Sequence, residues 1–300
     1  MKLSGAYTAV VTPFLASFEV DGDALDALVD AQIEGGISGL VPCGTTGESP
    51  TLDHEEHLGV VKRVIARAAK RVPVIAGTGS NSTREAISMS KRAAELGADA
   101  VMIVMPYYNK PTQAGLVEHC KQVAASVGKK PVILYNIPGR TGIDLLPDAV
   151  EAICQAAPNV VGIKEATGNI LRAQELVRRL GDRLTVLSGD DALTLGMMAV
   201  GAKGVISVTS NVLPREVQEV CALASAGKYD EARKKHLALV PVHDAMFLEA
   251  NPGPVKSLLA DAGVIRPIVR SPLAFPGEAA RARVREALAA YRSASGQGAR

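Results

Sequence analysis

The sequence predicts an α/β protein, a (β/α)8 (TIM) barrel followed by a C-terminal helical appendage. Short apolar windows that are typical of buried strands alternate with helical windows, eight of each, over roughly the first 225 residues. From about residue 229 the windows are helical only and are interrupted by prolines. We therefore expect a catalytic barrel over residues 1–228 and a helical region over 229–300, with residues 293–300 as a frayed tail.

The predicted strands are short apolar runs, most of them followed by glycine, proline or a small polar residue. They cover residues 6–12, 39–43, 72–76, 100–105, 131–135, 160–164, 184–187 and 204–208. The helical windows that can be bounded are 23–34, 53–70, 83–96, 113–127, 147–156, 170–180 and 192–200. Asp53 and Glu56 form a capping-box pattern at the start of the second helix. A doubly wound open sheet is the competing fold, but it would need a nucleotide loop, and neither GxGxxG nor GxxxxGK[ST] occurs.

Composition excludes several classes of partner. The net charge is +2 and the chain has no Trp and only four Phe, so no basic surface with interleaved aromatics is available for nucleic acid. The apolar runs are too short to cross a membrane, and the first residues lead straight into a strand rather than a signal peptide. Four widely spaced cysteines without a CxxC pair predict reduced thiols in a cytoplasmic protein, without a disulfide framework or a zinc site.

Lys164 ends the sixth predicted strand. An ammonium group is costly to desolvate, so a lysine that faces a barrel interior must pair, lose its proton or take part in chemistry. The neutral amine is the nucleophile that forms Schiff bases with carbonyl substrates. On this stretch alone, a lysine that extends from a strand end to water remains an equal alternative.

The residues at the carboxyl ends of the other strands favour a lysine that takes part in chemistry over one that extends to water. In a barrel these ends share one mouth, and here they carry hydroxyls and glycine-lined loops without a carboxylate pair or a histidine. That set argues against glycoside hydrolysis, metal-dependent hydrolysis and a serine triad, and favours imine chemistry on a 2-oxo acid. Tyr135 lies one strand before Lys164 and could shuttle protons if a second hydroxyl orients it, with Thr45 and Tyr108 as candidates.

Two loops offer anion-binding groups. Residues 44–47, Gly-Thr-Thr-Gly, present backbone N–H groups and hydroxyls to a small carboxylate, and Arg140 could grip a second carboxylate with its planar fork. Each of these candidates also has a purely structural alternative. Residues 44–47 could be an ordinary turn, and Arg140 could be a solvated loop arginine. Tyr135 could be a packed strand tyrosine, and Tyr108 could pack on the fold or on another subunit.

Taken together, six motifs resemble the dihydrodipicolinate synthase family of pyruvate-dependent class I aldolases. They are GTTGE at 44–48, PYYNKP at 106–111, YNIPGRTG at 135–142, GIKE at 162–165, GVIS at 204–207 and NPGPVK at 251–256. The resemblance spans nearly the whole chain. Several motifs are shared with the wider family, which includes N-acetylneuraminate lyase and ketodeoxygluconate aldolase, whereas the arginine of the YNxPxRTG loop is the narrower signal. A sugar-acid aldolase is therefore the alternative enzyme, and a barrel that only binds an oxo acid is the alternative outside catalysis.

The resemblance implies that pyruvate condenses with L-aspartate 4-semialdehyde to 4-hydroxy-tetrahydrodipicolinate, the first committed step towards diaminopimelate and lysine, without a cofactor. It implies that Lys164 carries the imine, and that Tyr135, Thr45 and Tyr108 form the proton relay, Tyr108 from a neighbouring subunit. Substrate contacts implied by the same resemblance are Thr46 to the pyruvate carboxylate, Arg140 to the semialdehyde, and backbone at Gly189 and Ile206. Family members are commonly homotetramers built from two tight dimers.

A second site follows from the same resemblance. His54-Glu55-Glu56-His57 lacks the HExxH spacing of a metal site, and a solvated first helical turn explains it equally well. In lysine-inhibited synthases, however, matching residues line a lysine pocket at the dimer interface: Ser49, His54, His57, Asn81, Glu85 and Tyr107. Pro50 replaces the small residue expected beside Ser49. We therefore expect L-lysine as an inhibitor, with a strength that the sequence does not predict.

Overall fold

Eight parallel strands form the barrel that the sequence predicts. The computed structural model describes residues 1 and 3–296. The strands are β1 (Gly5–Ala9), β2 (Gly39–Val41), β3 (Ile75–Gly77), β4 (Ala100–Val104), β5 (Val132–Asn136), β6 (Val160–Glu165), β7 (Thr185–Ser188) and β8 (Gly204–Ser207). They pair in the order β2-β1-β8-β7-β6-β5-β4-β3, and a parallel bridge between Leu40 and Val74 joins the two ends of this order. The fold class is thereby confirmed.

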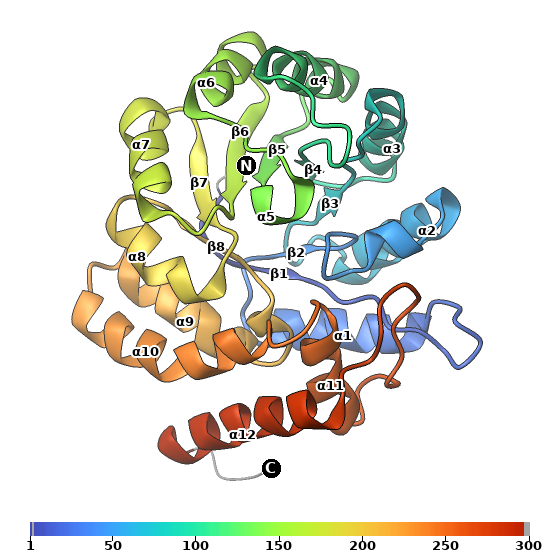
Figure 1. Cartoon of the computed structure of the whole chain (residues 1–300), viewed down its shortest axis with the longest axis vertical. Helices are drawn as coiled ribbons and strands as arrows, with labels where there is room; N and C mark the ends of the chain where they lie inside the picture. Colours follow the sequence, from blue (N-terminus) through green and yellow to red (C-terminus); the bar gives the residue numbers. More distant parts are fainter. Residues whose placement is uncertain (2, 297–300) are drawn as a thin grey trace.

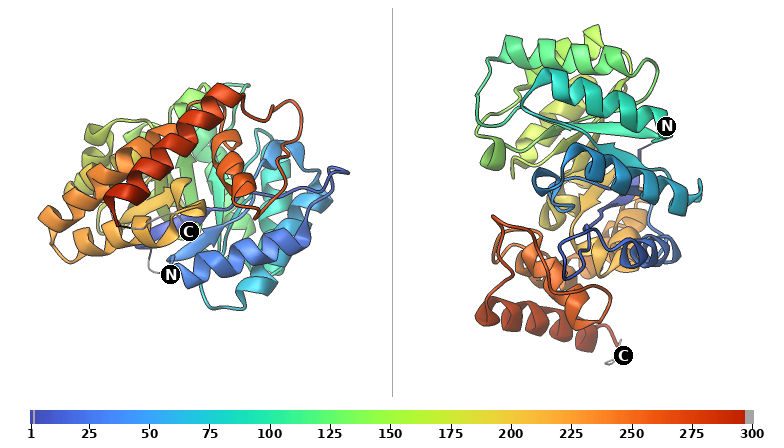
Figure 2. Two further views of the ribbon diagram at one scale, coloured as in Figure 1. Left: turned by 90° about the horizontal axis from the view of Figure 1, so that it is seen from below. Right: turned by 90° about the vertical axis from the view of Figure 1, so that its right-hand side faces the viewer.

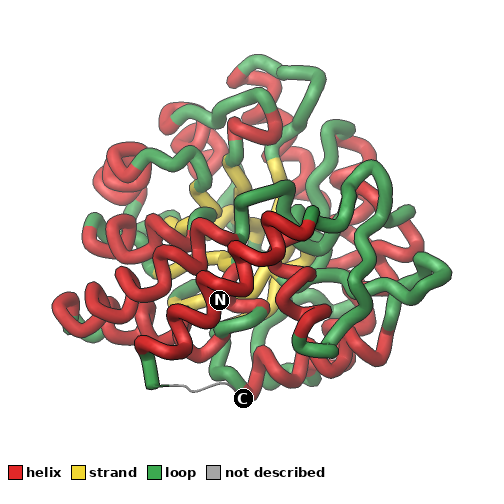
Figure 3. The backbone as a smooth tube through the Cα atoms, turned by 60° about the horizontal axis from the view of Figure 1, so that its bottom comes forward, coloured by secondary structure: helices red, strands yellow, loops and turns green. Residues whose placement is uncertain are grey.

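Helices surround the strands in chain order (Figures 1 and 3). They are α1 (Gly22–Glu34), α2 (His54–Ala68), α3 (Thr83–Glu95), α4 (Gln113–Ser126), α6 (Pro147–Ala156), α7 (Ile170–Leu180), α8 (Thr194–Ala199) and α9 (Pro214–Ser225). The capping box at the start of α2 is present, because Asp53 accepts from the Glu56 N–H and the Glu56 carboxylate accepts from the Asp53 N–H.

Side-chain alternation divides the apolar residues between two layers. Even-numbered positions of β5, such as Val132 and Leu134, pack outward against the helices, whereas Ile133 and Tyr135 belong to a separate cluster inside the barrel. The inward cluster comprises Leu3, Tyr7, Ala9, Val41, Ile75, Ala100, Met102, Ile133, Tyr135, Leu187 and Ile206. A group that ends an inward-facing row is therefore shielded by the barrel wall on all sides except the mouth.

The C-terminal region is helical, as predicted. It contains α10 (Tyr229–Ala245), α11 (Gly253–Asp261) and α12 (Glu278–Ala294), and α12 lies at the end of the molecule away from α4 and α6 (Figures 1 and 2). These helices share an apolar cluster with barrel residues such as Leu28 and Leu213. The division at residue 228 stays a prediction. The frayed tail that we predicted at residues 293–300 starts too early, because α12 continues to Ala294. Residues 297–300 lie outside the described part of the chain.

Element boundaries differ from the predictions where polar contacts intervene. β1 ends at Ala9 instead of residue 12, because the Val11 N–H donates to the Asn211 side chain instead of a neighbouring strand. The helix expected at 192–200 is split, since the Asp190 carboxylate caps a 3-10 turn at Asp191–Leu193 before α8 begins. A short helix, α5 (Pro138–Thr141), occupies the loop after β5 and was not predicted. In the described part of the chain, none of the helices has both the length and the apolarity to cross a membrane.

Candidate active site

Lys164 lies inside the barrel near the carboxyl end of β6. It pairs in register with Tyr135 on β5 and with Leu187 on β7, both of which belong to the inward cluster. Only 5% of the lysine is exposed, and its Nζ lies 4.4 Å from the centroid of the Tyr135 ring. The alternative of a lysine that extends to water is therefore excluded by the geometry.

Tyr135 and Thr45 line the same small hollow. It has a volume of about 40 Å3 and is bounded by the Gly44-Thr45 turn, by Gly77 to Gly79 after β3, and by Met102 and Val104 of β4. Tyr135 is buried and Thr45 is half-buried, so the two hydroxyl-bearing side chains share a sheltered space at the mouth. This arrangement suits a proton relay, which requires hydroxyls that are held near one another and away from bulk water.

The Gly44 to Glu48 turn is held by contacts from several elements. Cys43 and Glu48 both adopt left-handed backbone conformations, with φ of 55° and 54°, which non-glycine residues adopt at a cost and which occur often at functional sites. The Thr12 hydroxyl donates to the Gly47 carbonyl at 2.7 Å. Thr46 is almost completely buried, and its Oγ1 accepts a hydrogen bond from Asn251 Nδ2 at 3.0 Å. The turn is thus a fixed structure rather than a free surface loop.

Gly189 lies beside the end of the lysine strand. The Gly189 N–H donates to the Glu165 carbonyl at 2.8 Å, and a Cβ at position 189 would lie 2.6 Å from the Ala166 Cβ. That close approach of the segments after β7 and β6 requires a residue without a side chain. Ile206 lies on β8, which β7 separates from β6, and it faces the barrel interior opposite Tyr7 of β1. The structure therefore places Gly189 next to the lysine strand and Ile206 in the inward cluster.

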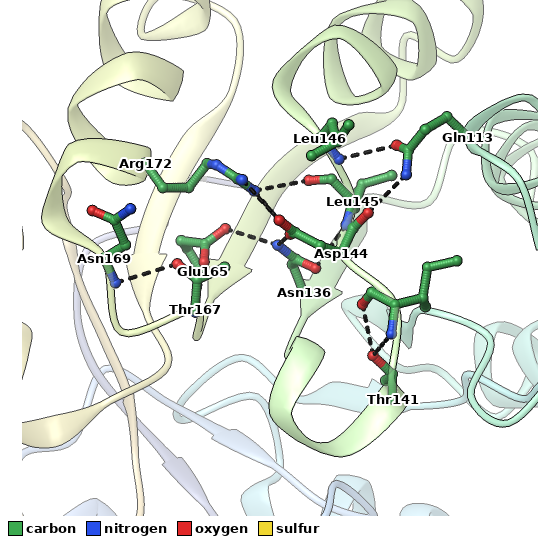
Figure 4. A network of polar contacts seen from close by, with 11 residues as sticks. Gln113, Asn136, Thr141, Asp144, Leu145, Leu146, Glu165, Thr167, Asn169 and Arg172 are labelled. Carbon is green, nitrogen blue, oxygen red and sulfur yellow. Dashed lines mark hydrogen bonds and ion pairs between the residues drawn. The ribbon is translucent and has the colours of Figure 1, made fainter. Parts of the chain in front are cut away.

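A polar network is built on Asn136 and Glu165, the residues that follow Tyr135 and Lys164 on β5 and β6 (Figure 4). The buried Asn136 side chain donates to Asp144 at 2.8 Å and to Glu165 at 3.2 Å, and its carbonyl accepts the Leu145 N–H. Arg172 grips Asp144 through both carboxylate oxygens, and this guanidinium holds the pKa of Asp144 below its ordinary value. Burial raises the pKa of Glu165. The network fixes both ends of the loop that carries Arg140.

This network was not predicted from the sequence. Asn136 and Glu165 each follow an inward-facing site residue by one position, so strand alternation places them on the outward face. A buried polar residue on that face needs partners, and this requirement was the available signal. The partners themselves, Asp144 and Arg172, lie in a loop and a helix whose distance from the strands the sequence does not reveal.

Arg140 lies on α5 at the surface, and among the described residues it forms no ion pair. It lines a larger hollow of about 400 Å3, which Thr45 also lines. The structure therefore brings Arg140 and Thr45 to a common space. Tyr108 is different: it has φ of 72°, and 89% of the residue is exposed, so within a single chain its ring is almost free of contacts.

Five of the six residues expected in a lysine pocket line this same 400 Å3 hollow. They are Ser49, His54, His57, Glu85 and Tyr107. Asn81 does not line the hollow. Its backbone carbonyl accepts a hydrogen bond from Asn109 Nδ2. His57 belongs to α2 and packs against the end of β3, where its Nε2 is 2.7 Å from the Gly77 carbonyl oxygen. Burial lowers the pKa of His57. The structure places this histidine beside the end of β3 because α2 delivers it from outside the strands.

Several strand-end hydroxyls serve the scaffold. Thr78 bonds to Ser90, Ser188 donates to the Asp190 carbonyl and Ser207 accepts the Ser210 N–H, all within buried surroundings. These three hydroxyls therefore have partners within the protein.

Comparison with known proteins identifies the relatives of this chain. The sequence model of the Dihydrodipicolinate synthetase family matches residues 2–291. The chain belongs to this family. A relative from Sorangium cellulosum, named 4-hydroxy-tetrahydrodipicolinate synthase, is 60% identical over 289 residues, which cover 96% of each chain.

Solved structures of family members share the whole architecture. The 4-hydroxy-tetrahydrodipicolinate synthase of Methylacidiphilum fumariolicum SolV has a TM-score of 0.96 at 44% identity, with 99% of this chain and 98% of that chain covered. The dihydrodipicolinate synthase of Acinetobacter baumannii, described as complexed with pyruvate, has a TM-score of 0.94 at 46% identity and covers 97% and 99%. The Cyanidioschyzon merolae protein, described with lysine bound, has a TM-score of 0.93 at 37% identity and covers 96% and 98%.

Proposed function

We propose that this chain is a 4-hydroxy-tetrahydrodipicolinate synthase, which condenses pyruvate with L-aspartate 4-semialdehyde through an imine on Lys164. The observation that carries this proposal is the buried amine of Lys164, 4.4 Å from the Tyr135 ring inside the barrel. The high identity to relatives of that name over nearly the full chain supports the substrates. The reaction would be the first step of a route to diaminopimelate and lysine.

In the first half of the reaction Lys164 Nζ attacks C2 of pyruvate, and a C–N bond forms while the carbonyl oxygen takes up a proton. Loss of water then gives the imine. Tyr135 and Thr45 would carry the proton from nitrogen to the departing hydroxyl, since both line one sheltered hollow. Removal of a proton from the pyruvate methyl group converts the imine to an enamine, whose carbon is the nucleophile of the next step.

In the second half this carbon attacks the aldehyde of the second substrate, and the aldehyde oxygen is protonated. The amino group of the semialdehyde then attacks C2, closes the six-membered ring and displaces the Lys164 amine. Arg140 would hold the carboxylate of the semialdehyde, because it is exposed, has no ion pair among the described residues, and lines the hollow that Thr45 also lines. Electrons and protons balance without a cofactor.

The remaining site residues would position pyruvate. Thr46 would donate its hydroxyl to the pyruvate carboxylate, and the backbone at Gly189 and Ile206 would border the substrate next to the lysine. The hydrogen bond of Gly189 to the end of β6 and the inward position of Ile206 on β8 support these roles. Tyr108 would act from a neighbouring subunit of a homotetramer, a role that suits a side chain that is 89% exposed in the single chain.

Reductive trapping tests the proposal directly. Borohydride added with pyruvate should attach a pyruvyl-sized adduct to Lys164, located by mass spectrometry of peptides, and the Lys164→Ala protein should remain unlabelled. Purified wild-type protein should then consume L-aspartate 4-semialdehyde but not a 2-keto-3-deoxy sugar acid. Label on another lysine, or turnover by the Lys164→Ala protein, would refute the imine assignment.

L-Lysine would bind in the 400 Å3 hollow and inhibit. When His57 Nε2 donates to the Gly77 carbonyl, Nδ1 is left as an acceptor for an ammonium group, and the exposed Glu85 supplies a negative charge. A lysine complex of the Cyanidioschyzon merolae relative supports the site. Activity that does not change at millimolar lysine would contradict this part of the proposal.

A cytoplasmic location is supported by the four buried, free cysteines.

A further inference from the structure

The C-terminal region reaches into the turn that carries the site threonines. Asn251 lies between α10 and α11, 205 residues away from Thr46 in sequence, and its Nδ2 donates to Thr46 Oγ1 at 3.0 Å. Asn251 is 5% exposed and Thr46 is 2% exposed. A hydrogen bond so well shielded from water competes with no solvent and fixes both partners.

An ion pair anchors the same segment. Lys256 of α11 contacts Glu48 at 2.5 Å, and both side chains are completely buried. The second oxygen of Glu48 accepts the Arg270 N–H at 2.9 Å, so neither oxygen of the carboxylate is left without a donor. Lys256 and Arg270 each lie 4.4 Å from the centroid of the Phe14 ring. The turn and the C-terminal segment are therefore held as one rigid unit.

The direction of the hydrogen bond determines what Thr46 can do. A hydroxyl has one proton to donate and lone pairs that accept. Because a lone pair of Oγ1 receives the Asn251 amide, the Thr46 proton is turned towards a different partner, and a substrate carboxylate is an acceptor without protons of its own. A donor that is oriented before the substrate arrives loses less entropy on binding.

A second atom of Asn251 points to function rather than to packing. Its Oδ1 is buried and has no hydrogen-bond partner among the described residues. An unsatisfied buried oxygen lowers stability, so a residue selected for structure alone would be expected to avoid it. Among the described residues, the hydrogen bond of the Asn251 side chain is the one that it donates to Thr46.

We propose that Asn251 is a positioning residue of the reaction, which holds the Thr46 hydroxyl as a donor to the carboxylate of the 2-oxo acid. The inference rests on the proposed function, since it assumes that this carboxylate binds at the turn. It assigns to the C-terminal helical region a part in substrate binding that none of the barrel strands supplies.

Asn251→Asp tests the proposal with almost no change of shape. The aspartate offers only acceptors, so the Thr46 proton turns towards residue 251 and is lost to the substrate. We expect the pyruvate concentration for half-maximal borohydride trapping, and KM for pyruvate, to rise about tenfold, as for a lost hydrogen bond to a charged group. Both kcat and KM for the semialdehyde should stay within about twofold, because neither depends on this bond.

Double variants separate positioning from stability. In a Thr46→Val background Asn251→Ala should cause no further rise in KM for pyruvate, whereas a merely structural role would give additive losses. The control is Asn159→Ala, since Asn159 Nδ2 donates to three carbonyls, one near the end of α4 and two in the segment between α4 and β5. This variant should lower the melting temperature and leave KM for pyruvate unchanged.

The outcomes remain distinguishable from failure of the proposed function. Wild-type protein that is not labelled at Lys164 would contradict the proposed function itself. Normal wild-type labelling, together with folded Asn251→Asp and Asn251→Ala proteins that keep the wild-type KM for pyruvate, would overturn only the role of Asn251. If Asn251→Ala melts below the assay temperature, Asn251→Asp alone decides.

Discussion

Tyr135 and Lys164 occupy paired positions on β5 and β6, and the lysine Nζ lies 4.4 Å from the centroid of the tyrosine ring. The ring thus shields the amine from one side, while the hydroxyl of the same residue is a candidate for proton transfer. The two contributions of Tyr135, shielding and proton transfer, can be separated by substitution.

Tyr135→Phe should remove proton transfer and keep the shielding. We expect kcat to fall by about 10²- to 10⁴-fold, the usual contribution of a general acid–base group. Pyruvate should still be trapped on Lys164, but more slowly, because the ring remains above the amine. Stopped-time trapping with mass spectrometry measures the rate, and thermal melting checks the fold. Unchanged turnover in a folded protein would exclude Tyr135 from the relay.

Arg140→Ala should impair the second substrate selectively. The guanidinium is exposed and unpaired among the described residues, so its removal leaves no buried charge and should change stability by less than about 0.5 kcal/mol. We expect kcat/KM for the semialdehyde to fall about 100-fold, as for a lost charged contact, with normal trapping of pyruvate. Arg140→Lys should recover only part of the loss, since an ammonium lacks the planar fork. Equal losses for both substrates would contradict the assignment.

Lys256→Met should destabilise the protein strongly. The substitution leaves the Glu48 carboxylate buried without its cation, and loss of one partner of a buried pair typically costs about 3–5 kcal/mol. Adding Glu48→Gln should recover much of the loss, because no charge is then buried. Chemical denaturation measures both effects. The matched control is Lys235→Met, whose pair with Glu219 is about half exposed, and it should cost less than about 1 kcal/mol. Similar losses in the two lysine variants would show that burial of the pair does not matter.

Buried histidines should make stability fall on mild acidification. Burial lowers the pKa values of four histidines: His57, His119, His236 and His243. Each binds a proton more readily when the chain is unfolded, so the free energy of unfolding decreases as the pH falls below about 6.5, the ordinary value for histidine. Above that pH the penalty is absent. Glu165 and Asp190, whose pKa values burial raises, oppose this slope.

A single variant isolates the histidine contribution. His119 is buried, and its Nε2 has no partner among the described residues. Relative to His119→Asn, wild-type protein should lose stability from pH 6.5 downward by up to about 1.4 kcal/mol per pH unit. Urea denaturation at several pH values measures the difference. His54→Asn at the exposed start of α2 is the control, and its profile should run parallel to that of the wild type. A parallel profile for His119→Asn as well would contradict the prediction.

The barrel and the position of Lys164 could be predicted because strand alternation and the helix–strand rhythm are local signals. Lys164 and Tyr135 are close because neighbouring strands pair in register, which follows from the fold class alone. The capping box of α2 was likewise readable from two residues.

The missing parts of the site depend on contacts between distant segments. Arg172 of α7 reaches Asp144 in the loop after β5, and Asn251 reaches Thr46 because the segment between α10 and α11 returns to the first third of the barrel. The contacts of Tyr108 cannot be described from one chain either, because the residue is almost fully exposed there. Periodicity and turn chemistry describe neighbours in sequence and give no distance between such segments.

The contact between Glu48 and Lys256, 208 residues apart, has a consequence for the order of assembly. During synthesis all eight strands emerge before residue 256 does, and contacts with large sequence separation form late because their loop must close first. The ring of strands can therefore precede a finished mouth. A nascent chain that stops short of the NPGPVK segment would contain Lys164 and Tyr135 but would leave the turn at residues 44–48 without its partner, so competence for the keto acid would come with the last quarter of translation.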